Sequence, residues 1–156
     1  MRRRRADKRK IFPDALYKST IITKFINKVM KDGKKSIARK IVYKALEGLV
    51  KKLNAGDTLE TFEKALENAK PSLEIKSRRI GGATYQVPVE IAPERRTALA
   101  MNWIILNAKT KVGRNMIEGL INELSDCYNN QGATIKKKDD THKMAEANKA
   151  FAHYKW

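Results

Sequence analysis

The sequence has few of the residues that build disulfide frameworks, metal centres or membrane spans. Its 156 residues include a single cysteine, Cys127, which excludes an intramolecular disulfide and a cysteine-only zinc cluster and suits the reducing cytoplasm. The two histidines, His142 and His153, are not spaced as zinc ligands are. The longest apolar runs, such as residues 103–106, fall far short of the roughly 20 residues that span a bilayer. The sequence therefore predicts no metal site and no membrane partner.

Motifs for catalysis are also scarce. The glycine pair at 81–82 lacks the lysine-containing phosphate loop and the spaced glycines of dinucleotide sites. Glu90 and Glu94, and the acidic pair at 139–140, have no nearby nucleophile or general base. We therefore predict no enzyme activity, no catalytic residue and no cofactor.

Acidic residues are half as numerous as basic ones, because 17 Asp and Glu against 34 Lys and Arg give a net charge of +17. The excess is segregated: residues 1–40 carry +12, residues 71–96 carry +2 and residues 131–156 carry +3, while the rest is neutral. Separate basic surfaces that meet one polyanion would explain this pattern, because each neutralised phosphate releases condensed counterions. Nucleic acid is the predicted partner, and a folded RNA suits several separate surfaces better than duplex DNA does.

Helical periodicity accounts for most of the chain, whereas residues 1–18 lack it and are expected to stay extended or disordered until they meet a partner. On the fourth helix we expect Leu99, Trp103 and Leu106 to face the core. The acidic pair at 139–140 would favour an N-terminal turn of the sixth helix, whose start within 132–148 stays open. The predicted helices run from residue 19 or 20 to 33, 34 to about 54, 57 to 71, 93 to about 111, about 114 to 128, and within 132–148.

One segment, residues 73–91, interrupts the helical pattern with two runs rich in Ile, Val, Thr and Tyr around the glycine pair. Glycine supplies the positive φ of a tight hairpin loop, which places Arg78 opposite Tyr85. Neither face is uniformly apolar near the tip, so the hairpin is expected to reach into solvent or onto a polar partner. The residues expected to anchor its ends are Leu73, Ile75, Val89 and Ile91. The predicted fold is a mainly α single domain, 1–156, of about six helices with one extended β-hairpin between helices three and four.

Three stretches together resemble the family of bacterial ribosomal small-subunit protein seven. They are residues 29–35 (VMKDGKK), residues 76–96 (with KSRRIGGATYQVPVE and PERR) and residues 136–156 (KKKDD to AFAHYKW). The resemblance spans essentially the whole chain in the right order. It implies a primary binder of 16S ribosomal RNA in the cytoplasmic small subunit, which nucleates assembly of the head through the 3′ major domain.

The resemblance also implies roles for particular segments. The hairpin would lie at the subunit interface near the exit-site tRNA and the mRNA path. From the residues alone, Tyr85 is available to stack or pack. The tail at 149–156 would contact small-subunit protein eleven, protein nine would be a second neighbour, and the chain would not be a homo-oligomer in the assembled subunit. The implied tRNA-proximal and mRNA-proximal residues are Arg78, Arg79, Gly81, Gly82 and Tyr85, and the implied tail contacts are Lys149, Tyr154, Lys155 and Trp156. The implied ribosomal RNA contacts are Arg2, Arg3, Arg4, Arg5, Lys8, Arg9, Lys10, Lys34, Lys35, Lys76, Arg78, Arg79, Arg95, Arg96, Lys136, Lys137 and Lys138.

Two alternatives remain from the residues alone. An architectural DNA-binding protein can also combine a helical body with basic β-arms, although such arms usually act in a symmetric dimer. A strong preference for nonspecific duplex DNA would favour that reading. A helical RNA-modifying enzyme is disfavoured because no cofactor loop or catalytic cluster is recognisable, and product formation on ribosomal RNA would revive it.

Overall fold

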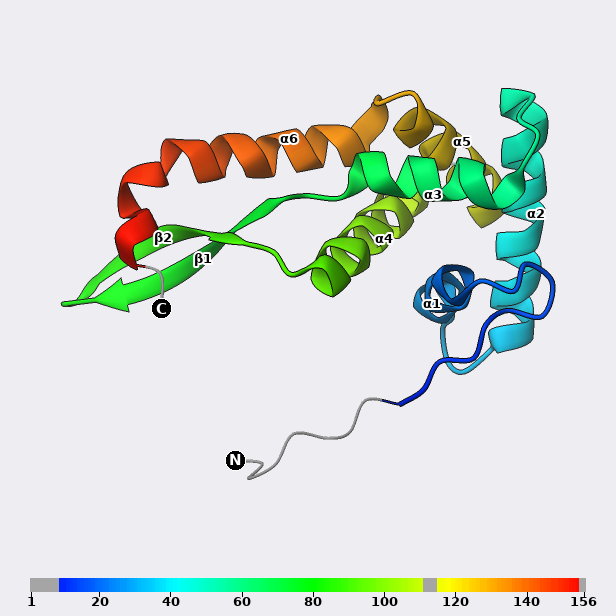
Figure 1. Cartoon of the computed structure of the whole chain (residues 1–156), viewed down its shortest axis with the longest axis horizontal. Helices are drawn as coiled ribbons and strands as arrows, with labels where there is room; N and C mark the ends of the chain where they lie inside the picture. The colour runs from blue at the N-terminus through cyan, green and yellow to red at the C-terminus, as the bar shows by residue number, and fades with distance from the viewer. Residues whose placement is uncertain (1–8, 111–114, 155–156) are drawn as a thin grey trace.

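The structure is a computed structural model that describes residues 9–110 and 115–154. It is mainly helical, with a two-stranded antiparallel sheet between the third and fourth helices, as the sequence predicts (Figure 1). The α-helices are α1 (Thr20–Val29), α2 (Lys35–Leu53), α3 (Thr58–Ala69), α4 (Pro93–Thr110), α5 (Met116–Tyr128) and α6 (Gly132–Ala147). The strands are β1 (Leu73–Ile80) and β2 (Ala83–Glu90), and a short 3-10 helix, η1 (Lys149–Tyr154), follows α6.

Local capping chemistry sets several helix boundaries where the sequence predicts them. Ser19 precedes α1, and its hydroxyl accepts a hydrogen bond from the backbone N–H of Ile21. Asp57 precedes α3, and its carboxylate accepts hydrogen bonds from the backbone N–H groups of Leu59 and Glu60 in the first turn. Helix α2 ends at Leu53 and is capped by Asn54, which adopts a left-handed φ of 48°. These boundaries depend on neighbours in sequence, which explains why they are predictable.

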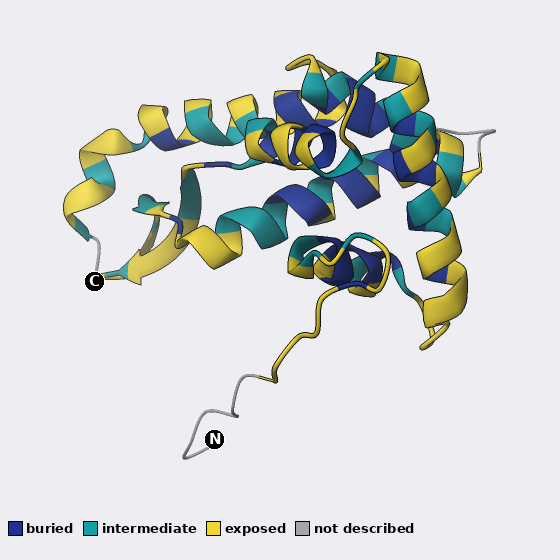
Figure 2. Cartoon of the chain, turned by 45° about the vertical axis from the view of Figure 1, so that its right-hand side comes forward, coloured by how far each residue is buried: buried dark blue, intermediate teal, exposed yellow. Residues whose placement is uncertain are grey.

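The hydrophobic core forms where α5 packs against α2, α3 and α4 (Figure 2). The rings of Phe25 and Phe62 are fully buried there, with centroids 5.2 Å apart. The contact between α4 and α5 is close because Gly119 has no side chain: a Cβ at this position would lie 2.5 Å from the carbonyl oxygen of Ala108. This body positions the surrounding loops and the hairpin.

The predicted buried face of α4 is wrong. Leu106 is 58% exposed and Leu99 and Trp103 are only half-buried. The helix carries apolar residues around its whole circumference at 103–106, so periodicity does not define one face. Because α5 packs closely against α4, the buried face of α4 is the one that includes small side chains. The buried residues of α4 are Ala100, Met101, Ile104, Ile105 and Ala108.

The predicted first turn of α6 is also wrong, because Asp139 and Asp140 lie in the middle of this helix and are exposed. The helix begins at Gly132 without a side-chain cap from Gln131. A tertiary contact stabilises its first turn: Glu123 of α5 accepts hydrogen bonds from the N–H of Thr134 at 3.0 Å and from its hydroxyl at 2.6 Å. Such a contact between distant residues leaves no local pattern in the sequence.

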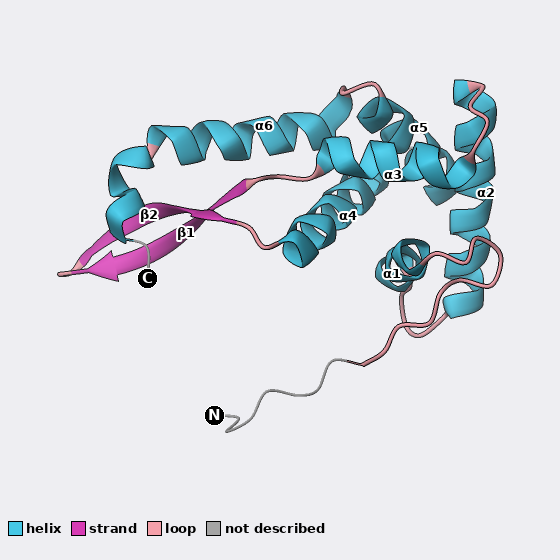
Figure 3. Cartoon of the chain, viewed as in Figure 1, coloured by secondary structure: helices cyan, strands magenta, loops and turns pink. Residues whose placement is uncertain are grey.

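The hairpin has the predicted register, with Arg78 paired with Tyr85 and Lys76 paired with Val87. Its tip is exposed, but the hairpin does not project freely, because α6 and η1 lie along it (Figure 3). Val87 is 1% exposed and Ile91 is 2% exposed. The other residues expected to anchor its ends, Leu73, Ile75 and Val89, are half-buried.

Candidate nucleic-acid interface

The basic N-terminal segment is anchored to the body at Asp14, which is 6% exposed. Its carboxylate accepts hydrogen bonds from the N–H groups of Leu16 (3.1 Å) and Tyr17 (3.4 Å) and from the hydroxyl of Tyr43 (2.6 Å). Burial by itself would raise the pKa of Asp14, but these hydrogen bonds outweigh burial and hold the pKa below its ordinary value of 3.8. The expectation that all of 1–18 stays extended therefore fails at residues 14–17, where the chain forms a turn.

Residues 9–13 precede this anchor and are exposed, including the predicted RNA contacts Arg9 and Lys10. The anchor fixes where the basic segment leaves the body, beside α1 and the adjoining part of α2 (Figure 1). The other contacts predicted on this segment lie outside the described residues. They are Arg2, Arg3, Arg4, Arg5 and Lys8.

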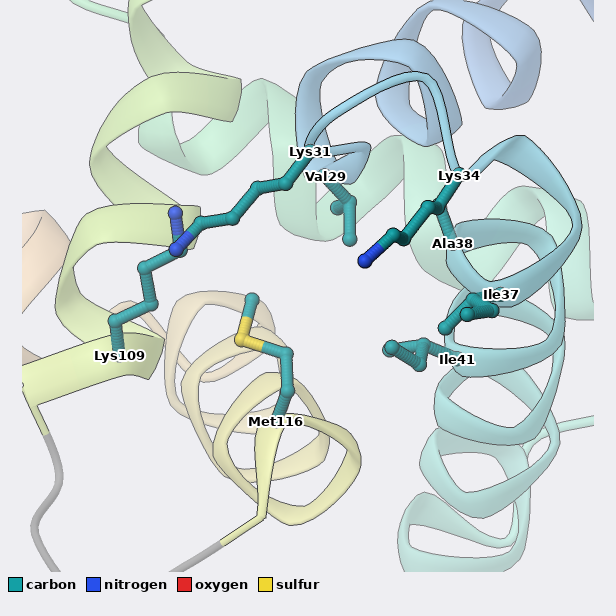
Figure 4. A pocket seen from close by; sticks show the side chains of 8 residues that line it. All are labelled: Val29, Lys31, Lys34, Ile37, Ala38, Ile41, Lys109 and Met116. Carbon is teal, nitrogen blue, oxygen red and sulfur yellow. The ribbon is translucent and has the colours of Figure 1, made fainter.

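A hollow of about 360 Å³ lies between the α1–α2 loop, the end of α4 and the start of α5 (Figure 4). The ammonium groups of Lys31 and Lys34 reach it from the α1–α2 loop and that of Lys109 reaches it from the last turn of α4, and no described carboxylate lines it. The loop turns sharply because Asp32 and Gly33 adopt successive positive φ values of 52° and 72°. The apolar side chains that line the hollow are Val29, Ile37, Ala38, Ile41 and Met116.

The hollow adds cations that were not predicted. Lys34 and its exposed neighbour Lys35 were expected at the first helix junction, whereas Lys31 and Lys109 were not. Lys31 belongs to the same VMKDGKK stretch and could have been included. Lys109 lies 75 positions after Lys34 in the sequence, and only the packing of α4 brings it to the same hollow. Three lysines above apolar side chains can neutralise backbone phosphates while offering an apolar surface.

The cations at the base of the hairpin are engaged within the chain. The Arg95 guanidinium donates from Nε to both Glu74 oxygens, at 3.0 and 2.9 Å, and its Nη2 lies 2.8 Å from Oε2. The hydrogen bond from Arg95 lowers the pKa of Glu74, and Lys76 adds a weaker contact to the same carboxylate at 3.4 Å. Arg96 donates from Nε to the carbonyl oxygen of Ile91 at 2.8 Å. Arg95 and Arg96 therefore fasten the hairpin to α4.

The tip of the hairpin differs from its base. Arg78 and Arg79 are exposed, and neither has an acidic partner among the described residues. As consecutive residues of a strand they point to opposite faces. Gly81 and Gly82 form the exposed loop, with φ values of 55° and 90°. Two guanidinium groups are thus presented around a narrow tip, a geometry suited to phosphate.

Tyr85 is not a free stacking platform. Its ring centroid lies 5.3 Å from that of Phe151 and 5.3 Å from that of Tyr154, both in η1. The predicted tail residue Tyr154 therefore contacts the hairpin within this chain. Lys149 is exposed, and the predicted tail contacts Lys155 and Trp156 lie outside the described residues.

The three consecutive lysines of α6 also differ from one another in exposure and in their contacts within the chain. Lys136 and Lys137 are exposed. Lys138 is half-buried and its ammonium group donates to the carbonyl oxygen of Asn68 at 2.8 Å, in the last turn of α3. Carbonyl groups in the last turn of a helix lack intrahelical partners, so a cation stabilises them. Lys138 therefore joins α6 to α3 as well as adding positive charge.

Within residues 9–110 and 115–154, no group of three or more His, Cys, Asp or Glu side chains could hold a metal ion. No helix in those same ranges is long and apolar enough to cross a membrane. The features that remain are exposed cations on separate segments of the surface.

Comparison with known proteins agrees with this picture. Residues 1–149 match the family model described as ribosomal protein S7p/S5e. A protein from Protochlamydia amoebophila named small ribosomal subunit protein uS7 is 66% identical over 155 residues, which cover 99% of each chain. The protein of the same name from Chlamydia trachomatis serovar D is 65% identical across the full length of both chains. The chain therefore belongs to the ribosomal protein S7p/S5e family.

Proposed function

We propose that this protein is a structural constituent of the small ribosomal subunit and a primary binder of 16S ribosomal RNA. Its contact with the 3′ major domain would nucleate assembly of the head. The relatives at 65–66% identity, which are named small ribosomal subunit proteins, support the first part. The observation that carries the second part is the hollow at the α1–α2 junction, where three lysines converge and no carboxylate of the described residues lines the surface.

The separation of the basic surfaces favours a large folded RNA. The N-terminal segment and the α1–α2 loop lie at one end of the body, and the basic hairpin tip lies far from them (Figure 1). Each surface can neutralise only a few phosphates, but together they can hold distant segments of one RNA in a fixed arrangement. Binding and RNA folding are then coupled, because the contacts form together only when the RNA has the matching shape.

Lysine and arginine side chains have different roles in this proposal. The lysines around the hollow neutralise phosphate at longer range, and the arginines at the hairpin tip offer a planar fork for closer contacts. Arg95 and Arg96 act mainly by fastening the hairpin to the body, since Glu74 and the Ile91 carbonyl already occupy them. Lys136 and Lys137 add a further exposed basic surface on α6.

The remaining roles are part of the same proposal. The hairpin would lie at the subunit interface near the exit-site tRNA and the mRNA path, with Arg78 and Arg79 closest to them. The tail would contact small-subunit protein eleven, and protein nine would be a second neighbour in the head. The whole chain would act as one RNA-binding domain in the cytoplasmic ribosome. Its basic N-terminal arm and its hairpin would both reach RNA, and its tail would reach a neighbouring protein.

The test compares two triple variants of equal charge. Lys31, Lys34 and Lys109 line the hollow, and replacing all three with Ala should weaken binding to the isolated 3′ major domain. The slope of log K against log salt is negative, and each lost phosphate contact makes it shallower by about 0.9. We therefore expect the slope of the triple variant to be shallower by about two to three. The matched control replaces three exposed lysines elsewhere on the surface, Lys44, Lys51 and Lys143.

The control should change the salt slope by less than about one unit, because its lysines make no specific phosphate contact in this proposal. Filter binding across a salt series measures both variants. Equal losses in the two variants would show that only total charge matters, which would contradict a specific site at the hollow.

A further inference from the structure

The basic hairpin needs support from outside its own two strands. A two-stranded hairpin is marginally stable alone in water, and here β1 and β2 form the whole sheet. Its base is fastened to α4 by Arg95 and Arg96. The tip lies at the far end of the strands from that attachment (Figure 1). Something else must therefore hold the tip in a defined position.

The C-terminal part of the chain supplies two further attachments. The first is close to the base, where Nε2 of His142 on α6 accepts from the N–H of Ser72 at 3.0 Å and lies 3.2 Å from its hydroxyl oxygen. The second lies much closer to the tip, where η1 folds back onto β2. Figure 3 shows α6 running alongside the hairpin and η1 turning onto it.

The attachment near the tip is aromatic. The rings of Phe151 and Tyr154 are nearly parallel, at 11° and 6.4 Å, and each lies 5.3 Å from the ring of Tyr85 on β2. His153 packs against Tyr154 from 4.0 Å. Aromatic pairs at such distances and tilts attract each other beyond simple burial. We call Tyr85, Phe151 and Tyr154 the aromatic clamp.

The clamp lies on the same face of the hairpin as one of the two tip arginines. Tyr85 is directly opposite Arg78 in the antiparallel register, so their side chains share a face. Arg79 is paired with Thr84 and points to the other face. The position of Arg78 therefore depends on the clamp more directly than the position of Arg79 does.

We propose that Phe151 and Tyr154 are positioning residues for the basic hairpin tip and hold Arg78 where it meets RNA. This inference rests on the proposed function for its RNA contact. The C-terminal turn then has a role inside the chain, in addition to its proposed contact with neighbouring proteins. A partner that pulled η1 away from β2 would release the tip.

The first test measures the hairpin without RNA. Spin labels at Ala83→Cys on the hairpin and Lys51→Cys on α2 report the distance between tip and body, while native Cys127 is fully buried. The wild-type clamp should give one narrow distribution, and Phe151→Ala should broaden it. Phe151→Tyr should keep it narrow. If the distance distribution of Phe151→Ala were identical to that of the wild type, the clamp would not hold the tip and the proposal would be wrong.

Met144→Ala is the matched control, because Met144 is an apolar side chain on α6 that is 47% exposed and outside the clamp. It should leave the distribution narrow. A broadening equal to that of Phe151→Ala would show that any loss of apolar surface on this segment loosens the hairpin, and would also contradict a specific clamp.

The second test is a double-mutant cycle on binding to the 3′ major domain. Arg78→Ala and Phe151→Ala should each weaken binding about fivefold, and the double variant should be hardly weaker than either single variant. Phe151→Ala combined with Arg79→Ala should instead give close to the product of the two losses. If the losses from Arg78→Ala and Phe151→Ala instead multiplied in the double variant, Phe151 would not act by positioning Arg78. If the wild-type protein shows no preference for this RNA, the proposed function fails, while the label distances still decide whether the clamp exists.

Discussion

At the scale of single residues, Asp14 determines where the basic N-terminal segment joins the body. Its buried carboxylate fixes the turn at residues 14–17 and bonds to Tyr43 on α2. Nothing in the local sequence distinguishes Asp14 from an exposed acid next to Pro13. Its role depends on a residue 29 positions away, which only the folded chain brings near.

Asp14→Asn should destabilise the protein by about 1–3 kcal/mol at neutral pH, because it weakens a buried hydrogen-bond network. A carboxylate with a lower pKa in the folded chain stabilises the fold when it is ionised. This contribution is complete above the ordinary pKa of 3.8 and is lost as the pH falls through the lower folded-state pKa.

Urea unfolding between about pH 2 and pH 7 measures this effect. The difference in unfolding free energy between wild type and Asp14→Asn should be largest at neutral pH and shrink below pH 3.8. Tyr43→Phe removes one of the three hydrogen bonds and serves as the milder comparison. A difference that stays constant down to pH 2 would show that the charge of Asp14 does not matter.

Gly119→Ala should destabilise the contact between α4 and α5. The added Cβ would lie 2.5 Å from the backbone oxygen of Ala108, which no side-chain rotation can relieve. Overpacking of this kind costs about 1–3 kcal/mol. Gly56→Ala is the control, because a Cβ there would meet no atom within 4 Å. Thermal unfolding of both variants should show a clear loss for the first only, and equal stability would contradict the close packing of these helices.

At the scale of elements, a helix or strand feature can be predicted from the sequence when the residues that determine it are close together in the chain. The cap of α3 at Asp57 and the hairpin loop at 81–82 depend on adjacent residues, and both were predictable. The buried face of α4 and the start of α6 depend on contacts with α5. Periodicity indicated the wrong face of α4, and the acidic pair at 139–140 indicated the wrong first turn of α6. The aromatic clamp joins β2 to η1, more than 60 positions later in the chain, so no local pattern in the sequence indicates it.

Shortening the hairpin by deleting residues 78–85 tests the division of work between elements. The α1–α2 junction and the N-terminal segment would remain, so head assembly should be largely retained, although binding to the isolated 3′ major domain should weaken because Arg78 and Arg79 are lost. Loss of the tip should instead alter tRNA retention or reading-frame maintenance. Reconstituted subunits and a frameshift reporter measure the two outcomes. Failure of the head to assemble would contradict this division.

At the scale of the whole molecule, charge and packing are separated. Residues 41–70 and 97–130 have no net charge and contribute much of the core, while the excess charge of +17 comes from the segments around them. The overall segregation was readable from the sequence. The convergence of Lys31, Lys34 and Lys109 was not, because it depends on how α4 packs beside the α1–α2 loop.

The central claim is that the protein recognises one folded RNA through separate basic surfaces, rather than binding any polyanion. Competition binding to the isolated 3′ major domain of 16S ribosomal RNA tests this most directly. Excess duplex DNA and scrambled RNA serve as competitors at about 0.2 M salt, where nonspecific electrostatic binding is much weakened. We predict a retained preference for the folded domain. Equal competition by DNA or scrambled RNA would contradict the claim and leave a general polyanion binder.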